Sequence, residues 1–155
     1  MDCAIRPLKP EDFNAVASMV IDLYQKDGFS HLTPERFKKT VDELNAHPDK
    51  GEICVIEREQ ITVGYIILVN FWSNDATGNI VFLDEFYILP DHRNQGIGTW
   101  VLEYLRSRFQ ADNAGIMLET TPYNQRVIPL YKRFGFIPAE NNFWQYMFRK
   151  TTYPQ

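Results

Sequence analysis

The segment Arg93-Asn94-Gln95-Gly96-Ile97-Gly98 has the residue types and spacing that point most directly to chemistry. It follows the apolar run Ile80 to Leu89, which is rich in β-forming residues and is stopped by Pro90. Glycines in such a turn let the backbone approach a ligand closely, and the first amides of a following helix point outward at the positive end of its dipole. The turn therefore predicts a pyrophosphate site. A helix is expected after it because apolar residues recur at helical spacing, namely Ile97, Val101, Leu102, Leu105 and Phe109.

Two common phosphate-binding motifs do not fit this turn. A dinucleotide-binding fingerprint needs a third small residue where this chain has Val101, and a P-loop needs Gly-Lys-Ser/Thr where it has Gly98-Thr99-Trp100. The string from Arg93 to Gly98 does match the R/Q-x-x-G-x-G/A signature of the GNAT superfamily of N-acetyltransferases. With the strand LDEFYILP before it and NQRVIPLYKRFGF near the C-terminus, the chain resembles that family from Leu83 to Phe136.

The resemblance implies that acetyl-CoA binds as a co-substrate. In the family the pantetheine arm pairs with the fourth strand, so Phe86 and Ile88 would contribute backbone groups. Amides between Gln95 and Thr99 would hold the pyrophosphate, and Arg93 would border the loop or remain a solvated surface charge. The residues expected to bind the coenzyme are Phe86, Tyr87, Ile88, Arg93, Asn94, Gln95, Gly96, Ile97, Gly98, Thr99, Asn124 and Tyr131.

Two acidic residues in the same strand are candidates for the catalytic base. An alkylamine has a pKa of roughly 10 and is almost fully protonated near neutral pH, so a carboxylate would assist its attack. Asp84 and Glu85 stand inside an apolar strand, where an acid is costly unless it is paired or used. Regular alternation would place them on opposite faces. LDEFYI resembles IEDFFV-type strands of the spermidine/spermine N-acetyltransferase branch, which favours Asp84 over Glu85. A salt-bridged carboxylate without a chemical role and an unassisted route through ordered water are the alternatives.

The C-terminal segment offers a candidate acid. Tyr131 lies where family members place the tyrosine that protonates the coenzyme A thiolate, and a phenol with a pKa near 10 suits a thiolate near 8.5. Its stripe with Val127 and Phe134 would equally suit a core aromatic ring. Asn124 matches a coenzyme-contacting asparagine and also fits an N-cap. Pro129 indicates that the helix begins later than Asn124, which affects that contact.

The remaining elements predict one mixed α/β domain over residues 1–155. The resemblance implies the GNAT fold, a central and mostly antiparallel sheet that is splayed between strands 4 and 5 and flanked by helices. Helices are expected from Phe13 to near Gly28, from Thr33 to Asn45–Asp49, from Ile97 to Phe109 and from Asn124 to Phe134. Strands are expected at Cys3–Leu8, Glu52–Arg58, Ile61–Phe71, Ile80–Leu89, Gly115–Thr121 and Phe143–Arg149.

The composition and charge of the chain indicate which kinds of partner to expect. The chain has 155 residues, 45% of them hydrophobic, and it lacks both an apolar run of about 20 residues and a secretory signal pattern, so we expect a cytoplasmic protein without a membrane partner. A net charge of −4 argues against nucleic acid and favours a cationic substrate. No metal site is expected because His31, His47 and His92 lack ligand spacing.

These observations predict an acetyl-CoA-dependent N-acetyltransferase that acts on a primary amine, first of all of a small molecule, by direct attack in a ternary complex. The alternatives are a non-catalytic acyl-CoA-binding module and an acetyltransferase that acts on a protein or peptide amine. A homodimer through Phe143 to Phe148 is a further alternative, although that segment fits the sheet as well. The candidates to line an acceptor pocket are Tyr24, Phe29, His31, Phe71 and Trp72.

Overall fold

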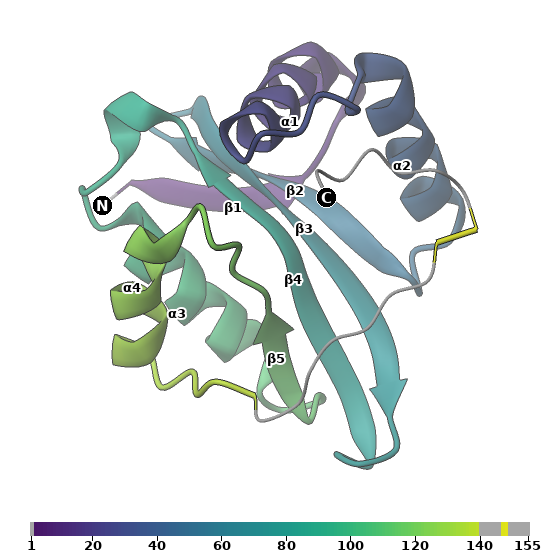
Figure 1. Cartoon of the computed structure of the whole chain (residues 1–155), viewed down its shortest axis with the longest axis vertical. Helices are drawn as coiled ribbons and strands as arrows, with labels where there is room; N and C mark the ends of the chain where they lie inside the picture. The colour runs from purple at the N-terminus through teal and green to yellow at the C-terminus, as the bar shows by residue number, and fades with distance from the viewer. Residues whose placement is uncertain (1, 140–146, 149–155) are drawn as a thin grey trace.

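The computed structural model describes residues 2–139, 147 and 148, and these form a five-stranded sheet flanked by helices (Figure 1). The strands are β1 (Cys3–Pro7), β2 (Gly51–Arg58), β3 (Ile61–Ser73), β4 (Gly78–Ile88) and β5 (Gly115–Leu118). The helices are α1 (Phe13–Lys26), α2 (Pro34–Ala46), α3 (Ile97–Phe109) and α4 (Ile128–Arg133), with 3₁₀ turns η1 (Pro10–Asp12), η2 (Pro90–His92) and η3 (Gln125–Val127). The predicted strand Phe143–Arg149 and the dimer surface on it lie outside the described residues, apart from Met147 and Phe148.

The strands follow chain order in the sheet, and only the last pairing is parallel. β1 to β4 form antiparallel neighbours, whereas β4 and β5 run parallel because α3 connects them. Helices α1 and α2 cover one face of the sheet, and α3 and α4 cover the other (Figure 1). The predicted mixed α/β class is therefore confirmed. Within residues 2–139 no helix combines the length and apolarity needed to cross a bilayer.

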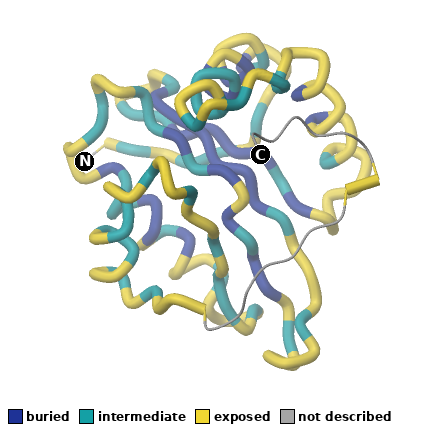
Figure 2. The backbone as a smooth tube through the Cα atoms, in the orientation of Figure 1, coloured by how far each residue is buried: buried dark blue, intermediate teal, exposed yellow. Residues whose placement is uncertain are grey.

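Two hydrophobic cores result, one on each face of the sheet. Val55 and Tyr65 pack with α1 and α2, while their chain neighbours Ile56 and Ile66 pack with α3. Burial on both faces explains why the central strands are almost continuously apolar in the sequence. Figure 2 shows this burial concentrated along the central strands and the helix surfaces that face them.

Capping residues and proline set the helix boundaries. Thr33 caps α2, since its hydroxyl accepts a hydrogen bond from the Arg36 amide at 3.3 Å, and Pro34 occupies the first helical position. The helix predicted from Asn124 is corrected, because α4 begins only at Ile128, with Pro129 in its first turn. The fifth strand is also shorter than predicted and ends at Leu118.

Strand β4 contains one extra residue. Leu83 pairs with Leu68 of β3 and Glu85 pairs with the adjacent Ile67, so Asp84 between them has no partner. This is a β-bulge, which bends a strand and locally interrupts the regular alternation of its side chains.

The sheet splays apart at the bulge. The last pair between β4 and β5 is Leu83 with Leu118, so residues 84–88 of β4 have no described strand on that side. The predicted splay between strands 4 and 5 is confirmed. It leaves an unpaired strand edge inside the sheet, close to the start of α3.

Candidate functional site

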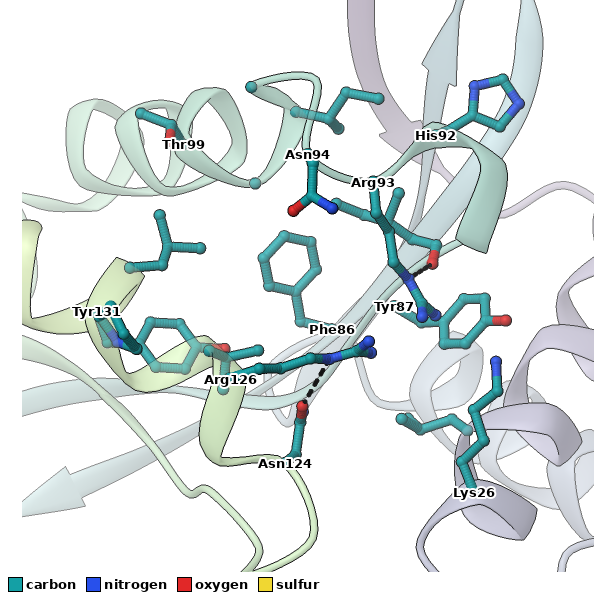
Figure 3. Close-up of a pocket in the computed structure, with 18 of the residues that line it drawn as sticks. Lys26, Phe86, Tyr87, His92, Arg93, Asn94, Thr99, Asn124, Arg126 and Tyr131 are labelled. Atoms are coloured by element: carbon teal, nitrogen blue, oxygen red, sulfur yellow. Dashed lines mark hydrogen bonds between the residues drawn. The ribbon is translucent and has the colours of Figure 1, made fainter.

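A cleft of about 800 Å³ lies where the splayed end of β4 meets the start of α3, the η3–α4 segment and the end of α1 (Figure 3). Among the predicted site residues, Gln95, Asp84 and Glu85 do not line it. The structure thus gathers two sequence motifs, about 30 residues apart, around one opening. The predicted coenzyme-binding residues that line it are Phe86, Tyr87, Ile88, Arg93, Asn94, Gly96, Ile97, Gly98, Thr99, Asn124 and Tyr131.

The turn before α3 presents backbone amides that have no helical acceptor. Asn94 and Gly96 adopt left-handed backbone conformations, with φ of 58° and 83°, which suits glycine at the second position. The first helical hydrogen bond runs from the Trp100 amide to the Gly96 carbonyl at 3.0 Å. The amides of residues 97–99 therefore remain available at the positive end of the helix, as an anion site requires.

Gln95 and Gly98 of the turn also make structural contacts. The Gln95 side chain donates to the Asp91 carbonyl at 2.8 Å and accepts from Arg58, so it is engaged outside the cleft. At Gly98 an added Cβ would lie 3.2 Å from Leu130 Cδ2, so glycine permits α4 to pack closely on α3. Gly98 thus supports both helix packing and access to the amides.

The unpaired edge of β4 also directs backbone groups into the wedge. The Leu89 amide donates to the Val63 carbonyl at 2.9 Å. Because hydrogen-bonding directions alternate along an antiparallel ladder, the backbone of Tyr87 also faces β3, while that of Phe86 and Ile88 faces the opposite side. Consistent with this, the Ile88 carbonyl accepts a hydrogen bond from Arg93 Nε at 2.7 Å.

The two acidic residues of β4 occupy different environments. Asp84 is exposed to solvent at the bulge, so the regular alternation on which we based opposite faces does not apply to it. Asp84 keeps access to solvent, but the protein around it still desolvates its carboxylate in part, and this desolvation and the negative charge of Glu119 raise the pKa of Asp84. This carboxylate sits beside the point where β5 leaves β4.

Glu85 is 9% exposed and lies between two tyrosines. Its carboxylate accepts hydrogen bonds from the hydroxyls of Tyr24 at 2.8 Å and Tyr65 at 2.7 Å. Burial raises the pKa of Glu85, whereas the two hydroxyls oppose that shift. Both carboxylate oxygens are therefore already engaged on the α1 side of the sheet.

Replacing Tyr65 by phenylalanine should lower the free energy of unfolding at pH 7 by about 1.5–3 kcal/mol, because a buried carboxylate loses a hydrogen bond. The pKa of Glu85 is higher in the folded state than in the unfolded state. Stability is therefore lost as the pH rises from the unfolded-state pKa of Glu85 to its folded-state pKa. Loss of the Tyr65 hydroxyl enlarges that cost. Denaturant unfolding should therefore show a large difference at pH 7 and a smaller one at pH 4. An equal loss at both pH values would indicate altered packing instead.

Tyr131 both packs against a neighbouring ring and lines the cleft. Its ring packs edge-on against Phe136 with centroids 5.7 Å apart, and the residue also lines the cleft (Figure 3). Burial raises the pKa of the Tyr131 phenol to about 12, so it stays protonated throughout the neutral range. A protonated, half-buried phenol at the cleft wall can donate a proton.

The predicted acceptor-pocket aromatics divide into two groups. Tyr24, Phe29 and His31 pack together, with centroid distances from 5.5 to 6.4 Å. Phe71 and Trp72 are exposed and pair with the first residues of β4, well along the sheet from Glu85. The first group therefore lies near the buried acid, and the second does not.

Sequence reasoning missed several residues of the cleft. Asp27 accepts a hydrogen bond from the Thr121 hydroxyl at 3.1 Å, which joins the end of α1 to the segment after β5. This contact brings α1 to the cleft, and nothing in the sequence around α1 signalled it. Arg126 had a weak signal, since it follows Asn124 in the motif. The missed lining residues include Lys26, Asp27, His92, Tyr123 and Arg126.

Comparisons with known proteins agree with this arrangement. The sequence model of the acetyltransferase (GNAT) family matches residues 17–136. Thialysine N-epsilon-acetyltransferase of Mus musculus is 32% identical over 78 residues, which cover 48% of this chain and 44% of that protein. The match thus spans less than half the length of this curated relative.

Solved structures share the fold. A possible acetyltransferase from Clostridium difficile 630 superimposes with a TM-score of 0.82 at 20% identity, covering 97% of this chain and 100% of that one. Glucosamine-6-phosphate N-acetyltransferase from Arabidopsis thaliana superimposes with a TM-score of 0.72 at 17% identity, covering 94% of this chain and 99% of that one. At such identities the likeness concerns the fold alone.

Proposed function

Because the chain belongs to the acetyltransferase (GNAT) family, we propose that it transfers an acetyl group from acetyl-CoA to a primary amine of a small molecule, by direct attack in a ternary complex. The observation that carries the proposal is the unpaired edge of β4 beyond Leu83, which shares one cleft with the amides at the start of α3. An extended thioester arm can pair with a strand edge while its phosphates meet helix amides.

Specific groups would hold the acetyl donor. The amides of residues 97–99 would bind the diphosphate, with Asn94 and Gly96 bordering them. Backbone groups of Phe86 and the amide of Ile88 would pair with the pantetheine arm, and one such amide would polarise the thioester carbonyl. Asn124, which directly precedes η3, would contact the coenzyme from the opposite wall of the cleft.

The proton transfers need a base and an acid. Asp84 would take a proton from the ammonium form of the acceptor, directly or through water, since its carboxylate is exposed beside the wedge whereas Glu85 is engaged by two tyrosines. The amine nitrogen then attacks the carbonyl carbon and the carbon–sulfur bond breaks. Tyr131 would protonate the departing thiolate. Nitrogen loses two protons in all. The first passes through Asp84 to water before the attack, and the second leaves the nitrogen after the attack and restores, through water, the proton that Tyr131 gave to sulfur.

Charge favours a cationic acceptor. The chain carries a net charge of −4, and Asp84, Glu85 and Glu119 cluster near the end of the β4–β5 pairing. The relative thialysine N-epsilon-acetyltransferase, as its name states, acetylates the Nε amine of thialysine. The charge supports a cationic acceptor, and the relative supports a free amine rather than a protein.

The test is release of coenzyme A thiol from acetyl-CoA across a panel of diamines and polyamines, lysine analogues, aminoglycosides, sugar amines and short peptides. Turnover should occur with a cationic small amine and be absent without acceptor. Turnover with peptides alone would refute the small-molecule assignment. If the protein binds acetyl-CoA in calorimetry yet no acceptor reacts, a non-catalytic acyl-CoA-binding module becomes the better description.

A further inference from the structure

Two arginines enter the cleft from opposite walls. Arg93 comes from the turn before α3 and Arg126 from η3, and Figure 3 shows both guanidinium groups directed into the same opening. They are near enough that the positive charge of Arg126, after burial, contributes to a lowered pKa of Arg93. Two like charges thus face each other across the space that a ligand would occupy.

Each guanidinium is held by its Nε atom. Arg93 Nε donates to the Ile88 carbonyl at 2.7 Å, and the guanidinium carbon lies 5.2 Å from the centre of the Tyr87 ring. Arg126 Nε donates to Asn124 Oδ1 at 3.2 Å. Because each guanidinium is anchored through Nε, its two terminal Nη groups extend beyond the anchor. These two groups form the fork that can bind two phosphate oxygens.

Neither of these two arginines forms an ion pair within the described part of the chain. No carboxylate there lies within 4.0 Å of either guanidinium. Lys26, at the same cleft, differs because it forms an ion pair with Asp22 at 2.5 Å. Arg93 and Arg126 therefore repel each other until an anion lies between them. A bound anion would gain two charge-assisted contacts.

We propose that Arg126 and Arg93 form a two-sided clamp on the diphosphate of the acetyl donor, and that Arg126 selects donors that carry this group. The inference rests on the proposed function, since it assigns further residues to the same donor. The diphosphate is favoured over the 3′-phosphate because Arg93 directly precedes the amides of the turn, so one anion can meet both. The clamp also ties η3 to the turn across the cleft.

The experiment is a binding comparison that requires no turnover. Calorimetry would measure coenzyme A and 3′-dephospho-coenzyme A, and an NMR titration would measure the weaker ligand pantetheine. Arg126→Gln should raise the Kd for both nucleotide ligands by the same factor, about 10- to 100-fold, and leave the Kd for pantetheine unchanged. Arg126→Lys should fall between the parent and Arg126→Gln, because the charge stays and the fork is lost.

Lys39→Gln provides the matched control, since it removes one positive charge from α2, outside the cleft. Its Kd values should equal those of the parent. An unchanged Kd for coenzyme A in Arg126→Gln would overturn the clamp. If the Kd for pantetheine rises by the same factor as that for coenzyme A, Arg126 has a structural role instead. If Arg126→Gln weakens the binding of coenzyme A but not that of 3′-dephospho-coenzyme A, the 3′-phosphate replaces the diphosphate as the group that Arg126 binds. Failure of the parent to bind coenzyme A would instead reject the proposed function itself.

Discussion

Replacing Tyr131 by phenylalanine is expected to lower kcat for acetyl transfer by about 100- to 1,000-fold, the usual range for loss of a positioned general acid. The ring would keep its edge-on contact with Phe136, so the cleft wall should persist. The Kd for acetyl-CoA should change little, because the lost proton donation matters only as the carbon–sulfur bond breaks. Steady-state kinetics together with calorimetry separate these two effects.

The pH profile sharpens this expectation. A general acid must be protonated, so activity that depends on Tyr131 falls only as the pH rises through its pKa of about 12. The parent should therefore show no Tyr131-dependent decline up to pH 10. Tyr104→Phe is the matched control, since it removes a tyrosine hydroxyl from α3 that does not line the cleft. Equal kcat in parent and Tyr131→Phe would disprove the acid assignment.

Asp84→Asn should reduce kcat/KM at pH 7 by about 100-fold, because the acceptor amine must then lose its proton without a base. A base acts only when ionised. The raised pKa of Asp84 therefore places the acidic limb of the parent profile above the ordinary value for aspartate, with activity lost as the pH falls through it. In the variant this limb should disappear and the rate should climb steadily as free amine accumulates.

Glu85→Gln provides the comparison that separates the two acids. We expect a smaller effect on kcat/KM than in Asp84→Asn, since the Glu85 carboxylate is buried and accepts from Tyr24 and Tyr65. A larger rate loss in Glu85→Gln than in Asp84→Asn would transfer the role of base to Glu85. Wild-type rates in both variants would leave attack assisted by ordered water as the mechanism.

Local sequence patterns were sufficient for most of the architecture. The turn from Arg93 to Gly98 and the helix after it were predictable, because glycine conformation and helical periodicity depend on neighbouring residues. Pro129 likewise indicated a late helix start, and α4 does begin at Ile128. The resemblance to a family added the splay of the sheet, which no local pattern encodes.

Features that depend on two distant segments could not be read in the same way. The bulge at Asp84 is a property of the register between β3 and β4, so alternation within one strand gave an argument that does not hold there. The place of Lys26 in the cleft depends on the Thr121–Asp27 contact, which joins residues 94 positions apart. Arg93 was predicted as a binding residue, but its position opposite Arg126 in the cleft could not be inferred from the sequence.

The bulge in β4 places Asp84 outside the regular side-chain alternation of the strand. Leu83 and Phe86 pack in the core beside α3, and Glu85 and Tyr87 turn to the other face, which is the alternation that a strand lacking residue 84 would have. A chain shortened by deletion of Asp84 would therefore retain every apolar side chain of β4 on its present face. Asp84 is in this sense an insertion into a complete strand, and the hydrophobic pattern places no demand on its side chain.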